Sequence, residues 1–461
     1  MPSPSAATLR AELRSLWALA LPIAIAQGGQ SLMSVVDTAV VSRAGERPLA
    51  AIALSTNIFF AVSSFALGLM MGVDPLMSQA MGANNARRAR GLLWQGSYLA
   101  VLVGTVTAVP MALVPRLLPL FGVELAELPE VTDYLTWRAP SLPLLLLFIN
   151  ARAYLMSVAS TRPLVVATVV ANVCNLGLNI LFVFGGSVLP EGWAWGPLRQ
   201  MPALGVEGSA IATLLCCVLQ WAIVAGTVRW VKVPGGPVPV APVWADLRQA
   251  LKVGLPIGLH IAAEVGVFSL AGLLARWISP QSLSAHQIVI SVSSLTFTVA
   301  QGIGNAGSVR VGWAVGANDT PRARLSGRVA LGSGAVFMAL TALVFLFFPR
   351  GVAWVMGAPP EVLPLAVPLM LVCAFYQIPD GVQGVGAGVL RGAGETRFTF
   401  QANMVGHYLV GLPLALGLGF GMGLGVQGIW WGLCAGLTCV ALALVWRFER
   451  QSAGTFRPLE S

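Results

Sequence analysis

The chain has 461 residues, of which 56% are apolar and only 10% are charged, and its formal net charge is +9. Ordinary globular proteins carry about 25% charged residues. This composition, with a mean hydropathy of +0.79, excludes a soluble protein and indicates an all-α protein that crosses a membrane many times.

Twelve stretches provide the roughly 20 apolar residues that a membrane-spanning helix needs. In chain order they cover residues 15–41, 49–80, 92–114, 132–156, 163–187, 204–229, 250–276, 284–314, 327–348, 361–390, 397–420 and 424–446. We therefore expect a cytoplasmic tail (1–14), an N-lobe of six spans (15–230), a cytoplasmic linker rich in Pro and Gly (231–249), a C-lobe of six spans (250–447) and a second cytoplasmic tail (448–461).

The two halves of the chain are related by an internal repeat. Residues 21–91 recur without a gap at an offset of 234, so that Leu21-Pro22 returns as Leu255-Pro256 and Gly82-Ala83-Asn84 returns as Gly316-Ala317-Asn318. Two copies of one apolar bundle are typical of secondary transporters, in which the ligand path lies between the copies.

The positive charge is interpreted as a sign of membrane topology. If both termini are cytoplasmic, most Arg residues fall in cytoplasmic loops, as the positive-inside rule requires, and the acidic residues Glu124, Glu127, Glu130 and Asp133 fall on the opposite side. The basic loops are not interleaved with aromatic residues, so a nucleic-acid partner is not expected. Arg10 and Arg14 precede an apolar run as in a signal peptide, but the repeat of this run is internal, so we expect it to be retained.

Four acids lie inside the expected spans. An acid at the centre of a span costs about 2.5–3.5 kcal/mol, so the default inference is a hydrated path or a bound cation. We apply that inference to Asp37, Glu264 and Asp380. Asp74 lies near a basic loop and is interpreted as an acid that reaches water at a helix end.

Each of these three acids shares a helix face with other polar side chains, and the eighth span carries a polar face of its own. Such faces, with spacings of three and four residues, predict a hydrated cavity. Its candidate lining residues are Gln30, Ser34, His260, Ser294, Thr298, Gln301 and Gln383.

The buried acids suit two kinds of coupling. A carboxyl group held away from water keeps its proton more tightly than one in water, so it can carry protons. Carboxylates beside amide and hydroxyl oxygens also resemble the all-oxygen sites of hard cations, as for Asp37 with Asn175 and Asn179, or Glu264 with Asp380 and Tyr376. The sequence leaves Na⁺ and H⁺ open, and no cofactor or other metal is expected. A negative cavity would also attract lipophilic organic cations.

Motifs for catalysis are not evident. The chain has no Walker-type phosphate loop, no Ser–His–acid arrangement, and three histidines without the spacing of zinc ligands. His407 is interpreted as a polar core residue with satisfied hydrogen bonds. An enzyme is therefore not expected.

Several motifs are shared with one family of transporters: Gln30-Ser31-Leu32-Met33 leading to Asp37-Thr38, Gly254-Leu255-Pro256 followed by Glu264, Ala285-His286-Gln287-Ile288, Val309-Arg310-Val311-Gly312 and Tyr376-Gln377-Ile378-Pro379-Asp380. On these motifs, residues 15–446 resemble the multidrug and toxic compound extrusion (MATE) family in its NorM-like branch. The resemblance implies two six-helix lobes related by a pseudo-two-fold axis along the membrane normal, in a bacterial cytoplasmic (inner) membrane.

The resemblance also implies a function and its sites. It implies a secondary active antiporter that exports varied, often cationic drugs in exchange for Na⁺ or H⁺ by alternating access, with no obligate protein partner. It places one cation site at Glu264, Tyr376 and Asp380, and a second at Asp37, Asn175, Asn179 and Thr213. Pro379 departs from the small polar residue of relatives and is expected to kink the tenth span beside Asp380. A flippase for lipid-linked precursors, or a metabolite exporter of the same superfamily, is the alternative; the flippase is disfavoured because no intramembrane arginine cluster is evident.

Overall fold

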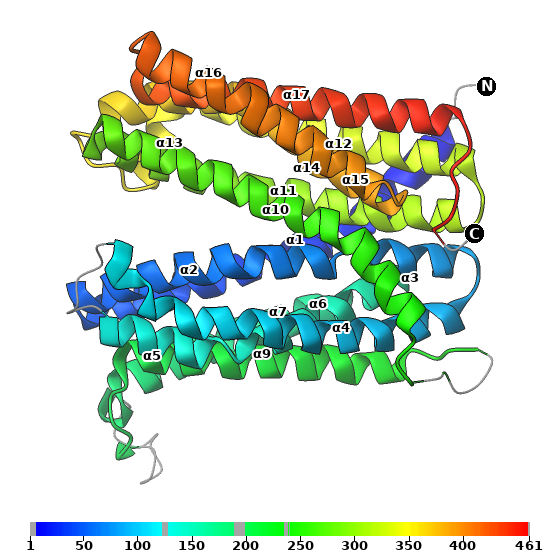
Figure 1. The fold of residues 1–461 in the computed structure, drawn as a ribbon, viewed down its shortest axis with the longest axis horizontal. Coiled ribbons are helices and arrows are strands. Elements are labelled where there is room, and N and C mark those ends of the chain that lie inside the picture. Colours follow the sequence, from blue (N-terminus) through cyan, green and yellow to red (C-terminus); the bar gives the residue numbers. More distant parts are fainter. Residues whose placement is uncertain (1–5, 122–127, 189–198, 235–237, 239, 460–461) are drawn as a thin grey trace.

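The computed structural model describes residues 6–121, 128–188, 199–234, 238 and 240–459, and every regular element in this described part is a helix. The helices form two layers that lie side by side with their long axes nearly parallel (Figure 1). Of the expected acidic stretch, Glu124 and Glu127 lie outside the described residues, as do Gly235, Gly236, Pro237 and Pro239 of the expected linker.

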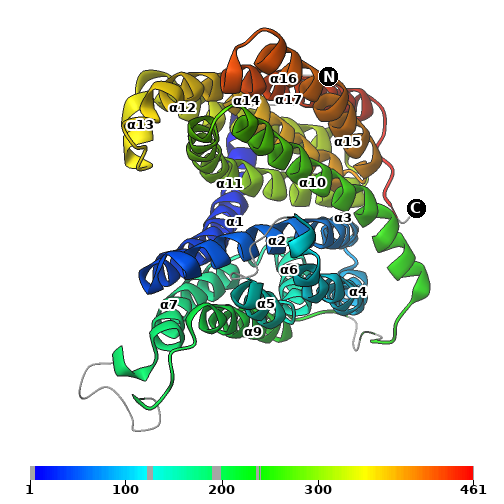
Figure 2. The same cartoon turned by 60° about the vertical axis from the view of Figure 1, so that its left-hand side comes forward.

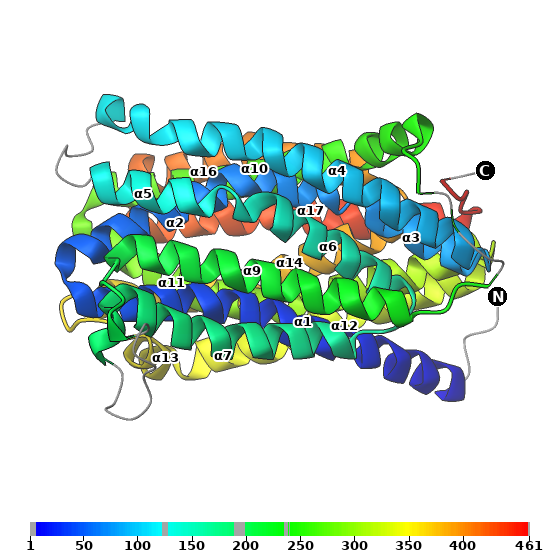
Figure 3. The ribbon, with the colours of Figure 1, turned by 90° about the horizontal axis from the view of Figure 1, so that it is seen from below.

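The N-lobe contains the first six spans. Seen from its outer face, α4, α6, α9 and α7 follow one another across the lobe (Figure 3). Its helices are α1 (Ala6–Val41), α2 (Glu46–Met70), α3 (Val73–Gly82), α4 (Ala86–Leu113), α5 (Leu128–Arg138), α6 (Ser141–Ser157), α7 (Arg162–Phe184) and α9 (Gly205–Trp230), with short 3₁₀ turns at Ser42–Ala44, Val114–Arg116, Leu118–Phe121 and Gly186–Val188.

The C-lobe contains the other six spans. Its helices are α10 (Trp244–Ile278), α11 (Pro280–Gly316), α12 (Thr320–Phe347), α13 (Pro349–Val355), α14 (Leu363–Gly392), α15 (Thr396–Asn403), α16 (Leu412–Leu416) and α17 (Gly425–Ala453). Two π-helical segments, η5 (Met404–Gly411) and η6 (Gly417–Gly421), continue α15 and α16 into one span. Pro379 lies inside an unbroken α14, where its ring removes the N–H that would bond to the carbonyl of Phe375.

Twelve helical segments of the described residues are long and apolar enough to cross a membrane, so the expected all-α fold of two six-span lobes is confirmed. Several helices extend beyond the expected spans: α1 begins at Ala6, α4 at Ala86, α10 at Trp244 and α12 at Thr320, and α17 continues to Ala453. Helix α1 passes from the C-lobe into the N-lobe (Figure 2), packing on α11 in one and on α7 in the other. Helix α10 makes the matching contact with α2.

The repeat in the sequence reappears as paired contacts between the lobes. A Cβ added to Gly82 of α3 would overlap the carbonyl of Trp313, and one added to Gly316 of α11 would overlap the carbonyl of Gln79. The offset of 234 relates Gly82 to Gly316 and Gln79 to Trp313, so the repeat converts one contact into the other. The helices α3 and α11 therefore cross on the pseudo-two-fold axis. Glycine at both positions lets the two helix backbones touch.

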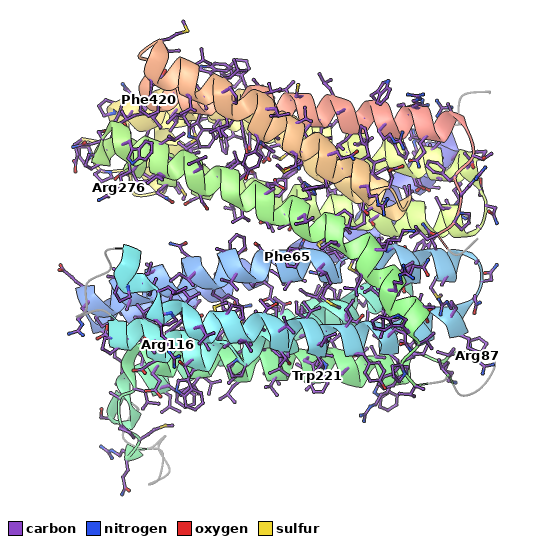
Figure 4. All side chains as sticks on the ribbon, in the orientation of Figure 1. Phe65, Arg87, Arg116, Trp221, Arg276 and Phe420 are labelled. Atoms are coloured by element: carbon purple, nitrogen blue, oxygen red, sulfur yellow. The ribbon has the colours of Figure 1, made fainter. Side chains whose placement is uncertain are left out.

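Both termini lie at one end of the bundle, which we call the terminal end (Figure 1). Arg87 lies at this end, whereas Arg116 and Arg276 lie at the opposite end (Figure 4). Four turns at the terminal end share one backbone conformation, with a positive φ at Asn84 (56°), Ala159 (58°), Asn318 (56°) and Gly394 (84°). Three of these residues are not glycine, although only glycine adopts this conformation without steric cost.

Two ion pairs with short hydrogen bonds join the lobes at the terminal end, among the described residues. Arg310 of α11 donates from Nε and Nη2 to the Glu12 carboxylate of α1, at 2.6 and 2.5 Å. Arg88 of α4 donates to Asp246 of α10, at 2.6 and 2.7 Å. Glu12 and Asp246 are equivalent under the repeat, so the first helix of each lobe is bound to an arginine of the other lobe.

The segment after α17 crosses the same seam. The backbone N–H of Leu459 donates to Gln79 Oε1 at 2.8 Å, and its carbonyl accepts a hydrogen bond from Gln249 Nε2 at 2.8 Å. Gln79 in turn donates to the carbonyl of Gly392 at 2.9 Å, and Phe456 is buried on Phe448. This segment, residues 454–459, therefore adds contacts to both lobes where they meet.

Candidate functional site

The predicted N-lobe site is assembled around Asp37, which α1 places in the interior of the lobe with 4% of its surface exposed. Its Oδ1 accepts hydrogen bonds from Nδ2 of Asn175 (2.9 Å) and Asn179 (2.8 Å), and its Oδ2 accepts one from Oγ1 of Thr213 (2.8 Å). The asparagines are one turn apart on α7, and Thr213 is on α9. The structure therefore brings all four predicted residues together.

This N-lobe cluster leaves two oxygens without partners. The Oδ1 atoms of Asn175 and Asn179 are buried and accept no hydrogen bond. Amide and carboxylate oxygens are the ligands that hard cations prefer, so the donor set fits a dehydrated Na⁺. A proton on Asp37 would be the alternative occupant, and the carboxylate has hydrogen-bond partners in place for either state.

A half-buried arginine, which the sequence reasoning missed, lies near this cluster. The Arg138 guanidinium of α5 lies 4.3 Å above the Phe59 ring and donates to Ser141 Oγ at 3.2 Å. It lies within electrostatic range of Asp37. Arg138 follows a polar stretch at a helix end, so its sequence context resembles that of an exposed residue.

The predicted C-lobe site joins α10 and α14. Nε2 of His260 lies 3.4 Å from Oε2 of Glu264, and 3.3 Å from Nε2 of Gln383. Asp380 and Tyr376, with 4% and 2% of their surface exposed, face the same space from α14. All five residues line one cavity of about 500 Å³.

The cavity lies between the lobes, because Asn57 and Phe60 of α2 line it together with residues of α10, α11 and α14. Phe65, labelled in Figure 4, lies on the same seam, where its ring contacts the Gly258 position of α10. Four predicted cavity residues are among those that line it: His260, Ser294, Gln301 and Gln383.

The other three predicted cavity residues lie elsewhere. Gln30 donates from Nε2 to Gln220 Oε1 at 3.0 Å, within the N-lobe. Ser34 is exposed on α1. The hydroxyl of Thr298 bonds to the carbonyl one turn before it in α11, at 3.0 Å. Helical spacing placed these residues on polar faces, but a polar face also forms where a helix satisfies its own hydroxyls.

Polar residues close the end of the cavity nearest the termini. Arg391 of α14 donates from Nη2 to Asn305 Oδ1 at 2.6 Å, and its Nε lies 3.9 Å from Oδ2 of Asp74. Asp74 is only 6% exposed, so the expectation that it reaches water at a helix end is wrong. It pairs instead with an arginine of the opposite lobe.

The model of the MatE family matches residues 22–181 and 256–416, one stretch in each lobe. The chain belongs to the MatE family. The expectation of a transporter rather than an enzyme is confirmed by this membership.

Relatives of this MatE chain match nearly its full length. A Multidrug resistance protein NorM of Burkholderia vietnamiensis is 33% identical over 446 residues, covering 94% of this chain and 93% of the relative. A Probable multidrug resistance protein NorM of Deinococcus radiodurans is 33% identical over 456 residues, covering 97% of each. The NorM-like resemblance is thereby confirmed.

Solved structures agree on the fold. The crystal structure of the eukaryotic MATE transporter AtDTX14 has a TM-score of 0.83 at 21% identity, and covers 96% of this MatE chain and 98% of its own. The crystal structure of a MATE P26A mutant has a TM-score of 0.84 at 18% identity, and covers 96% of each chain.

Sequence reasoning underestimated the buried arginines of this MatE chain. Arg310 and Arg391 are each 7% exposed, in the membrane-spanning helices α11 and α14. Two arginines are therefore buried inside membrane-spanning helices, each beside an acid of its own. The missed signal was the acid that each one faces, Glu12 or Asp74, since an arginine inside a span requires a partner.

Proposed function

We propose that this chain is a secondary active exporter of structurally diverse, often cationic compounds, which leave the cell in exchange for entering Na⁺ or H⁺. One observation carries the proposal: the cavity between the lobes contains the buried acid Asp380 and the half-buried acid Glu264. Apolar and aromatic walls with a few acids suit amphipathic organic cations. The names of the NorM relatives support the drug class.

The transport cycle would use two positions of the lobes. The contacts at the terminal end, including Glu12–Arg310 and Arg88–Asp246, fit a state closed on the cytoplasmic side, with both termini in the cytoplasm. Separating these contacts would open the cavity toward the cytoplasm. An ion can drive this exchange only if it binds the two states with different affinities.

Coupling would arise from competition at the C-lobe acids. A cation on Glu264 and Asp380 removes the negative charge that attracts the cationic drug, so the drug is released to the outside. After the cation leaves to the cytoplasm, the carboxylates attract drug again. The N-lobe cluster around Asp37 would bind a second cation, or would shift the equilibrium between the two positions of the lobes.

Efflux from proteoliposomes tests the proposal. The purified chain is reconstituted with a fluorescent organic cation inside, and an inward Na⁺ gradient or an inward proton gradient is imposed separately. Efflux in response to one gradient supports the proposal and identifies the ion. If neither gradient drives efflux, drug export as stated is refuted, and the flippase and the metabolite exporter become the leading functions.

The C-lobe assignment has its own test. Glu264→Gln and Asp380→Asn keep the shape of each side chain while removing its charge, so gradient-driven efflux should fall to the level of empty liposomes. A matched control is Glu361→Gln, an exposed residue outside the helices, which should transport normally. Normal efflux by both acid variants would refute the assignment.

A further inference from the structure

Among the described residues of the C-lobe, a pair of polar side chains one helical turn apart is buried without any partner. Asn403 of α15 and His407 of η5 each have 0% of their surface exposed. Neither Nδ2 nor Oδ1 of Asn403, and neither ring nitrogen of His407, has a hydrogen-bond partner in the described part of the chain. The expectation that His407 is a satisfied core residue is therefore wrong.

The register of α10 and α15 places this pair beside the C-lobe site. The two helices run in the same direction from the terminal end. Thr396 Oγ1 donates to the carbonyl of Val253, 143 residues earlier, and Tyr408 Oη donates to that of Ala263, 145 residues earlier. This offset puts Asn403 level with His260 and His407 level with Glu264.

Ring contacts agree with this register. The Phe268 ring, one turn after Glu264, lies 6.1 Å from the His407 ring and 6.4 Å from the Tyr376 ring, edge-on to both. His407 also lies within electrostatic range of His260. A third acceptor on this side of the site, Gln383 Oε1, is buried without a donor. These contacts therefore place His407 beside the C-lobe site, with Asn403 one helical turn before it.

The local helix geometry supports a site here. His407 lies in the π-helical segment Met404–Gly411, and π-helical turns inside α-helices often occur at functional sites. Burying an unpaired polar side chain costs more free energy than burying an apolar one. Positions 403 and 407 would therefore be more stable with apolar side chains if they served packing alone.

The chemistry of the pair identifies its ligand. Asn403 offers two donors and one acceptor, and neutral His407 offers one donor and one acceptor. Water is small, donates and accepts, and commonly occupies buried polar sites by making about three hydrogen bonds. Na⁺ fits less well, because imidazole nitrogen is not a ligand that hard cations prefer.

We propose that Asn403 and His407 hold buried water that extends the C-lobe site toward α15, and that through this water they position His260 and Glu264 for the coupling cation. The pair acts on the cation through other residues, so both are positioning residues. This inference rests on the proposed antiport, because the site it extends is the proposed cation site.

The titratable groups around His407 are few. His260 of α10 lies within electrostatic range of His407, and Tyr376 of α14 shares the Phe268 ring with it as a neighbour. Beyond these two lie the acids Glu264 and Asp380 of the C-lobe site, and α17, which packs on η5, carries Cys434. None of them bonds to His407 directly, so the water would be the connection. A change at 407 should therefore alter how tightly the coupling cation binds, and leave the drug-binding wall intact.

The test compares two substitutions at one position. His407→Leu fills the space without hydrogen bonding, and His407→Gln keeps a donor and an acceptor. For the ion that drives the wild type, His407→Leu should raise the half-saturating cation concentration about tenfold, or lower the half-maximal pH by about one unit if the ion is H⁺. His407→Gln should stay within about threefold of wild type. Drug affinity measured without the cation should not change in either.

Ser333→Ala is the matched control, since Ser333 of α12 also buries an unpartnered hydroxyl in the C-lobe and should leave the cation dependence unchanged. His407→Leu with wild-type cation dependence would overturn the proposal, and so would an equal loss of cation affinity in His407→Gln.

X-ray footprinting in H₂¹⁸O gives a readout independent of transport. Labelling of wild-type His407, despite its burial, supports bound water, and its absence refutes it. If the wild type transports with neither gradient, the antiport fails, whereas the footprint still decides whether water is present.

Discussion

The ion pair between Glu12 and Arg310 offers a direct test of how the lobes stay closed at the terminal end. Glu12 belongs to α1, whose other half carries Asp37 in the N-lobe, and Arg310 belongs to α11 of the C-lobe. The carboxylate accepts two hydrogen bonds from the guanidinium and a third from Ser326 Oγ at 2.6 Å. The perturbation is Glu12→Gln, which keeps the shape and removes the charge.

The magnitude follows from burial. The side chains of Arg310 and Glu12 are 7% and 9% exposed, and removing one partner of such a buried pair costs about 3–5 kcal/mol because the other charge is left uncompensated. Opening the terminal end would return Arg310 to water, so the cost falls on the closed state. Taking the lower figure of about 3 kcal/mol, the ratio of closed to open molecules should fall roughly 100-fold, at about 1.4 kcal/mol per factor of ten.

The assay is a distance measurement between spin labels at Ala83 and Ala317. These residues are exposed on the terminal end and equivalent under the repeat. The labels should be introduced in a background that lacks the exposed Cys439. Pulsed electron resonance should show a single short distance in the wild type and a dominant longer one in Glu12→Gln.

Two further variants make the result specific. The double variant Glu12→Arg with Arg310→Glu restores opposite charges across the seam and should recover the short distance, at least in part. Glu449→Gln breaks exposed pairs with Arg324 and Arg328 inside the C-lobe, so it should change nothing. An unchanged distance in Glu12→Gln would show that this pair does not hold the lobes together.

Three further predictions concern stability and the seam. Ala159→Gly should stabilise the protein by about 0.5–1 kcal/mol, because the residue adopts a positive φ that glycine tolerates; a melting point in detergent that stays the same or falls would contradict this. Gly316→Leu should abolish gradient-driven efflux without loss from the membrane, because the side chain would collide with the Gln79 carbonyl, whereas Gly332→Leu, which meets open space, should transport normally. Asp246→Asn should lengthen the spin-label distance less than the Glu12 variant, because its arginine partner is 29% exposed and so is better solvated; an equal or larger effect would refute that ranking.

Much of the site could be predicted because its residues lie on one face of single helices. Asn175 and Asn179 are one turn apart, and so are His260 and Glu264, so helical periodicity alone groups each pair. The acids inside the spans then mark where these faces must meet, since an isolated carboxyl group is too costly in a membrane. The repeat supplied the division into two lobes, which the paired glycine contacts reproduce.

The remaining features depend on tertiary contacts that no local pattern contains. Arg310 is held by an acid 298 residues away, and Arg391 faces Asp74 across the seam. In the sequence, Arg391 looks like a topological charge at the end of a span, and Arg310 stands out only as part of a family motif. The prediction that His407 has satisfied hydrogen bonds was wrong for a different reason. A polar residue in an apolar span usually has a partner, and only the packed structure shows that His407 has none among the described residues.

The contact between Gln79 and Leu459 has a consequence for biogenesis. The two residues are 380 positions apart, and Leu459 follows the last helix of the C-lobe, so the ribosome supplies it only after both lobes have been synthesised. Contacts of such high sequence separation form late in folding, because a long loop must close first. The newly made transporter therefore acquires this contact across the seam last. A nascent chain paused before residue 459 would insert both lobes while the seam at the terminal end still lacks the contact.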